Sequence, residues 1–79
     1  MDWREYIEQR PDVMVGKPVI TGTRLTVELI LEELSEGASE GDLLEGHPRL
    51  RLEDIRAALA FAAASLSSER TVFAELQAK

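Results

Sequence analysis

The sequence predicts a mainly α protein, a three-helix helix-turn-helix bundle with a short β arm or hairpin at its N-terminus and a helical tail at its C-terminus. Apolar residues recur at helical spacing in three stretches after residue 26. The two apolar runs before that point are short and are separated by proline and glycine. The 79 residues are near the lower size at which one domain folds alone. We therefore divide a single domain into the β arm (1–25), the bundle (26–66) and the tail (67–79).

The β arm is predicted from two extended stretches, residues 6–7 and 18–20, with Pro11 and Gly16 between them. The second stretch belongs to the segment GKPVITGTRLTV, which is rich in glycine and threonine. This segment is no phosphate-binding loop, because Pro18 follows its lysine and removes a backbone N–H that a phosphate would need. Two interpretations are open: a strand-to-helix junction, or a polar and cationic edge for phosphate or for a partner's acidic site. The edge would be formed by Lys17, Thr23 and Arg24.

The first helix is predicted over residues 27–36, with Thr26 as its N-cap and Gly37 at its end. Leu29 lies opposite the apolar face of this helix, and it is either part of an interface or an ordinary exposed leucine. The apolar face itself comprises Val27, Ile30, Leu31 and Leu34.

A shorter second helix is predicted over residues 40 to about 45, with Ser39 as its N-cap. Gly41 weakens it by about 1 kcal/mol, the usual cost of glycine in a helix interior. His47 ends it, because a residue before proline avoids helical backbone angles. The side chains that it offers to the core are Leu43 and Leu44.

The third helix, residues 52–66, has the strongest helical pattern. Its predicted core stripe comprises Leu52, Ile55, Leu59, Ala62 and Leu66. We expect the opposite arc to form a homodimer or partner interface, because an aromatic ring there is costly to leave in water and small side chains allow close helix approach. The alternative is that the alanines are simply good helix formers on a solvated surface. The expected interface residues are Ala57, Ala60, Phe61 and Ala64.

Charge is unevenly distributed along the chain, whose net charge is −6. Residues 27–46 carry seven acids and no base, whereas residues 47–66 carry a local charge of +1. Only the latter zone could face phosphate. In a helix-turn-helix protein, Arg49 and Arg51 would hold DNA phosphates and Arg56 would reach a base edge. The alternative is that these arginines form solvated ion pairs with nearby acids.

Composition argues against several other classes of function. The chain has no cysteine and one histidine, so we expect no disulfide, no metal site and no cofactor. The acids lack the spacing of a metal site and no catalytic motif is present, so we expect no enzymatic activity, no catalytic residue and no small-molecule substrate. No segment approaches the length of a membrane span and the first ten residues have no apolar core. We therefore expect a soluble, cytoplasmic protein.

Five segments taken in order closely resemble the bacterial and archaeal family catalogued as domain of unknown function 433: MDWREYI, GKPVITGTRLTVELILEEL, EG-S, DLLEGHP-L and EDIRAALAFAAA. The chain departs from the family pattern at His47, where an aromatic residue often stands, and at Gly41 and Gly46, which loosen the second helix.

The resemblance implies a homeodomain-like helix-turn-helix fold and a role as an antitoxin. Such an antitoxin would seal a small PIN-like ribonuclease toxin and, as a homodimer, would bind operator DNA. An interaction module with the same fold that does not bind DNA is the alternative. Antitoxins often cover the toxin with a C-terminal segment, so Phe73 in the tail is a candidate contact, with fraying of the tail as the alternative.

Overall fold

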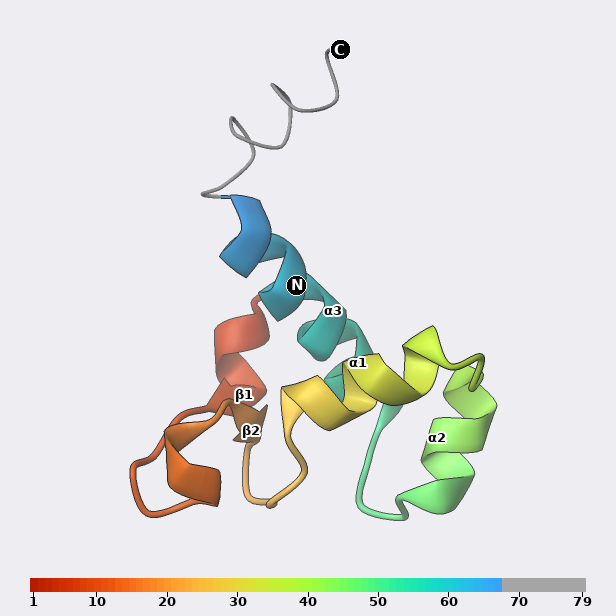
Figure 1. The fold of residues 1–79 in the computed structure, drawn as a ribbon, viewed down its shortest axis with the longest axis horizontal. Helices are drawn as coiled ribbons and strands as arrows, with labels where there is room; N and C mark the ends of the chain where they lie inside the picture. Colours follow the sequence, from red (N-terminus) through yellow and green to blue (C-terminus); the bar gives the residue numbers. More distant parts are fainter. Residues whose placement is uncertain (68–79) are drawn as a thin grey trace, which may run out of the picture.

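The computed structural model describes residues 1–67, and they form three α-helices preceded by a small β-hairpin (Figure 1). The elements in order are η1 (Trp3–Glu5), β1 (Ile7–Glu8), η2 (Met14–Gly16), β2 (Val19–Ile20), α1 (Val27–Ser35), α2 (Glu40–Gly46) and α3 (Leu52–Ser67). The predicted mainly α class with an N-terminal β arm is confirmed. The predicted contact at Phe73 lies outside the described residues.

The two strands pair in antiparallel register, with Ile7 opposite Ile20 and Glu8 opposite Val19. Ile7, Val19 and Ile20 are all buried, so the hairpin belongs to the core although its strands are only two residues long. The connection between the strands contains Val15, which has a φ of 57° and is 93% exposed. A β-branched residue rarely adopts this left-handed backbone conformation, so the connection is strained there.

Side-chain caps fix the start of α1 and of α2. Thr26 Oγ1 accepts a hydrogen bond from the backbone N–H of Leu29 at 3.0 Å. At α2, the N–H of Asp42 donates to Ser39 Oγ at 3.0 Å, and the Ser39 N–H donates to the Asp42 carboxylate at 2.9 Å. Each cap satisfies N–H groups that have no partner inside the helix. Both predicted N-caps are therefore confirmed.

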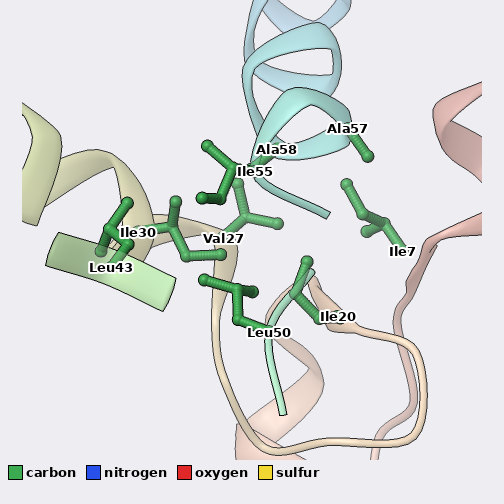
Figure 2. Packing of buried hydrophobic residues seen from close by; sticks show 9 residues of the cluster. All are labelled: Ile7, Ile20, Val27, Ile30, Leu43, Leu50, Ile55, Ala57 and Ala58. Atoms are coloured by element: carbon green, nitrogen blue, oxygen red, sulfur yellow. The ribbon is translucent and has the colours of Figure 1, made fainter. Parts of the chain in front are cut away.

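The core lies where α1, α2, α3 and the hairpin meet, and Figure 2 shows the side chains that fill it. Its members come from every one of these elements and from the loop before α3, which makes the hairpin and the helices one packing unit. The buried cluster comprises Ile7, Ile20, Val27, Ile30, Leu43, Leu50, Ile55, Ala57 and Ala58.

The buried face of α3 differs from the predicted stripe. Leu59 and Leu66 are 45% and 55% exposed, whereas Ala57 is fully buried and points toward Ile7 (Figure 2). Phe61 is half-buried and makes an edge-to-face contact with Trp3, with ring centroids 4.9 Å apart. The placement of Ala57 and Phe61 on an outer arc was therefore wrong.

The physical reason is the N-terminal segment, which packs on α3. η1 and β1 both lie against this helix, and alanine is small enough to let them approach its backbone closely. The sequence prediction ranked the faces of the helix by hydrophobicity, which favours leucines over alanines. The face that it chose is therefore turned from the buried face by about 100°, the angle between successive residues of an α-helix.

Within residues 1–67, every helix is too short or too polar to cross a lipid bilayer.

Candidate functional site

Two loops lie at the same end of the molecule and enclose a groove. The loop of residues 21–26 precedes α1 and the loop of residues 47–51 precedes α3, and both lie at the side away from the last turn of α3 (Figure 1). The groove between them has a volume of about 560 Å³. It is lined by Thr23, Arg24, Leu25, Leu29, Gly46, His47, Pro48, Arg49 and Leu50.

A smaller hollow of about 380 Å³ adjoins this groove. Thr23, Arg24 and Arg49 line both, so the two arginines stand where the depressions meet. The full lining of the hollow is Glu8, Arg10, Val13, Gly22, Thr23, Arg24 and Arg49. Three arginines from three separate segments thus converge here against one glutamate.

Backbone hydrogen bonds hold the loop that carries Arg24. Thr23 Oγ1 donates to the Ile20 carbonyl at 2.8 Å and accepts from the Leu25 N–H at 3.0 Å. Gly22 has a φ of 80°, which suits glycine, and its N–H donates to the Glu8 carboxylate at 3.0 Å. The Thr23 hydroxyl is therefore engaged in shaping the turn.

The arginines of this site differ in how far their charge is already paired. Arg49 donates a long hydrogen bond of 3.4 Å to the Gly22 carbonyl, and Arg10 lies 3.5 Å from the exposed Asp12 carboxylate. Within residues 1–67, Arg24 makes no hydrogen bond and no ion pair. Exposed pairs of this kind contribute little, so the guanidinium groups remain available to an anion.

His47 lies at the wall of the groove and is held by α1. Its Nε2 is 3.2 Å from Glu33 Oε2 and 3.3 Å from Glu33 Oε1, and both side chains are about one-third exposed or less. This contact ties the end of α2 to α1. The contact gives His47 a structural role at this end of the bundle.

Lys17 does not line the groove. Its Nζ lies 3.1 Å from Glu28 Oε1 on α1, and both side chains are exposed. The three residues of the predicted cationic edge are therefore not all at one site. Thr23 and Arg24 line the groove, and Lys17 does not.

The three arginines predicted to hold DNA lie in three different settings. Arg49 lines the groove, whereas Arg51 pairs with Asp54 at 3.3 Å and lies 5.8 Å from the centre of the Tyr6 ring. The hydrogen bond to Asp54 raises the pKa of the Arg51 guanidinium. Arg56 is exposed on α3, and its side chain has no hydrogen-bond or ion-pair partner in the described part of the chain. That these arginines contact DNA stays a prediction.

Two of the predicted interface residues remain at the surface. Ala64 is exposed and Ala60 is half-buried, and both lie on α3 beside the exposed leucines Leu59 and Leu66. Sequence reasoning had placed those leucines in the core, so it missed them as surface residues. It also missed Arg10 and Leu25 as lining residues, because no spacing along the chain brings them together.

No group of three or more histidine, aspartate or glutamate side chains in residues 1–67 is placed to hold a metal ion.

The fold and the site define a class, the small three-helix proteins whose N-terminal β-hairpin packs on the last helix. A family model described as "Protein of unknown function (DUF433)" matches residues 7–62, which is most of the chain. The protein belongs to this family, and the resemblance read from the sequence is confirmed.

A relative and a solved structure support the same assignment. The "Uncharacterized protein y4eO" of Sinorhizobium fredii is 38% identical over 74 residues, which are 92% of this chain but 34% of that relative. The chain thus spans about a third of the length of the curated relative. The crystal structure of a DUF433 member protein from Anabaena variabilis superposes with a TM-score of 0.74 at 28% identity, covering 87% of this chain and 68% of the other.

Proposed function

We propose that the protein is an antitoxin-like binding protein that neutralises a PIN-like ribonuclease in the cytoplasm. The antitoxin role is what the family resemblance implies. The observation on this chain that supports a protein-binding role is the exposed apolar stripe of α3, formed by Leu59, Ala63 and Leu66.

The stripe has the spacing of a helix-packing surface. Its residues follow one another at intervals of four and three, so they lie in one row along the helix. The last turns of α3 extend beyond the rest of the described chain (Figure 1), so the stripe is accessible to a partner. Alanine between two leucines lets another helix approach closely, and contact removes both leucines from water.

Two features of the chain support the alternative that it binds a partner protein but does not bind DNA. The surface of α3 offers one exposed base, Arg56, and an exposed acid, Glu53, so it has few groups that could read a base edge. The preceding segment 27–46 carries seven acids and no base, and this charge opposes a phosphate backbone.

Inhibition of the ribonuclease tests the proposal directly. The chain and the product of the neighbouring reading frame, which the proposal takes to be a PIN-like ribonuclease, are purified, and cleavage of a fluorescent single-stranded RNA is measured at increasing ratios of the two. We expect the wild-type chain to suppress cleavage, and Leu59→Glu and Leu66→Glu each to weaken inhibition about 10-fold or more, because a buried charge replaces an apolar contact.

Val15→Glu is the matched control, since it makes the same apolar-to-acid change at a side chain that is 93% exposed and lies far from α3 in the sequence. Sedimentation of the chain alone shows whether the stripe also pairs two copies, as a homodimer would require. Inhibition by both leucine variants at the wild-type level would exclude the stripe as the contact.

A further inference from the structure

We propose that the groove between the loops 21–26 and 47–51 binds a short acidic and apolar peptide segment of a partner protein. Bulky apolar side chains of that segment would occupy part of the groove, and its carboxylates would pair with Arg24 and Arg49. The inference rests on the proposed function only in taking the partner to be a protein.

The floor and walls of the groove are apolar. Leu25, Leu29, Pro48 and Leu50 all line it, and Leu29 is an exposed leucine, with 38% of its surface accessible. The volume of about 560 Å³ lies within the range of about 300–1,000 Å³ that is usual for ligand sites. A leucine or phenylalanine side chain is of a size to occupy it.

The rim of the groove is cationic in a chain that is otherwise acidic. Arg24 and Arg49 line both the groove and the adjoining hollow, and Arg10 joins them in the hollow. Glu8, the acid of this lining, already accepts the Gly22 N–H at 3.0 Å. Because guanidinium groups bind carboxylates in a bidentate manner, this rim complements a segment with acids on either side of an apolar residue.

Other occupants fit the groove less well. A phosphate backbone would gain nothing from the leucine floor and would meet the acids of the segment 27–46. Within residues 1–67 of a second copy of this chain, the acidic and apolar segments are α1 and α2, but their Ile30 and Leu43 are fully buried and so are not available to another molecule. A partner protein with a free segment of this composition remains.

Peptide binding by the whole chain tests the inference. The probe is a fluorescein-labelled peptide Asp-Glu-Leu-Phe-Asp-Glu, followed by fluorescence anisotropy. One comparison peptide carries serine in place of Leu-Phe and another carries lysine in place of the four acids. We expect the probe to bind at least about 10-fold more tightly than either comparison peptide, because the site requires both features.

Substitutions in the groove provide a second test of the inference. Arg24→Glu, Arg49→Glu and Leu29→Ser are each expected to weaken binding of the probe about 10-fold or more, while circular dichroism shows an intact fold. Arg56→Glu makes the same charge reversal at an exposed arginine that does not line the groove, and it should bind as wild type does.

Several outcomes would overturn the inference: equal binding of the three peptides, wild-type affinity in Arg24→Glu and Arg49→Glu, or displacement of the probe by an equal mass of random duplex DNA. Loss of a wild-type dimer in these two variants, seen by sedimentation, would assign the groove to a second copy instead.

The inference and the proposed function fail separately. Ribonuclease inhibition by a chain that does not bind the probe overturns the groove inference and leaves the α3 contact standing. Specific binding of the probe by a chain that does not inhibit the ribonuclease supports the groove and contradicts the antitoxin role.

Discussion

Asp54 is buried to 98% of its surface and holds the start of α3, although aspartate is rarely found in a core. Its Oδ2 accepts the backbone N–H of Arg51 at 2.9 Å, and its Oδ1 lies 3.3 Å from the Arg51 guanidinium. A carboxylate in the first turn also interacts favourably with the positive end of the helix dipole. Asp54 thus caps α3 from inside the helix, where no serine or threonine precedes it.

Removal of this carboxylate is expected to destabilise the fold. Asp54→Ala should lower the free energy of unfolding by about 1–2 kcal/mol, since the start of α3 loses the carboxylate that accepts the Arg51 N–H. Urea denaturation followed by circular dichroism measures the change. The control is Glu53→Ala, at the exposed neighbouring position, which should change the free energy of unfolding by no more than about 0.5 kcal/mol. Equal losses in the two variants would show that Asp54 does not act as the cap.

Val15 offers a stabilising change at the same scale. Its φ of 57° is unfavourable for a β-branched residue, and its side chain, 93% exposed, gains little from contacts. Val15→Asn should raise the free energy of unfolding by about 1 kcal/mol, because asparagine tolerates the left-handed conformation. The thermal unfolding midpoint reports the effect. A midpoint at or below that of the wild type would contradict the strain at this position.

At the scale of the element, α2 depends on its capping box. Helices this short are marginal in water, and α2 also contains Gly41. The backbone N–H of Ser39, and to a lesser extent its hydroxyl, hold the pKa of the Asp42 carboxyl below its ordinary value. A carboxylate whose pKa is lower in the folded than in the unfolded state stabilises the fold above the unfolded pKa. That contribution is lost as the pH falls through the folded pKa.

The cap therefore makes the stability of α2 depend on pH below about 4. Asp42→Asn keeps the shape of the side chain and removes its charge, so it should unfold at a lower temperature than wild type at pH about 7. The difference between the two proteins should shrink as the pH is lowered toward about 2.5, where the wild-type carboxyl is also neutral. Thermal scans at the two pH values measure it. A difference that is the same at both would show that the charge of Asp42 does not contribute.

The contact of η1 with α3 is the second element-scale feature. Trp3 and Phe61 meet edge to face at 82°, an arrangement that contributes beyond the area it buries. In a double-mutant cycle, Trp3→Ala and Phe61→Ala should show a coupling of about 0.5–1.5 kcal/mol in the free energy of unfolding. The pair Trp3 and Leu66 is the control and should be additive. Additivity for Trp3 and Phe61 would mean that η1 does not hold α3 through this contact.

At the scale of the whole molecule, charge is separated into an acidic part and a small basic site. The segment 27–46, which contains α1 and α2, carries seven acids and no base, whereas Arg10, Arg24 and Arg49 converge at the groove. A net charge of −6 repels nucleic acid over the molecule as a whole, so non-specific affinity for DNA should be low.

A gel shift tests this at two salt concentrations. The chain alone should give no shift of a random duplex at about 150 mM salt, because few phosphates can be neutralised by so acidic a protein. Its own upstream region is the matched probe for operator binding. A shift of that region that weakens steeply with salt, and that is lost in Arg56→Glu, would favour the DNA-binding form of the function over the interaction module without DNA binding.

The sequence by itself determined the two strands, the three α-helices and the family, but not the short helices η1 and η2. Caps and breakers act within a few residues, so Thr26, Ser39 and Pro48 place the ends of α1 and α2 almost without regard to the rest of the chain. The tertiary structure alone decided which face of α3 is buried, because Ala57 becomes core only when the N-terminal segment packs against it. The tertiary structure also decided which residues line the groove. Arg24 and Arg49 are separated by α1 and α2 in the sequence, and only the packing of those helices brings their charges to one rim.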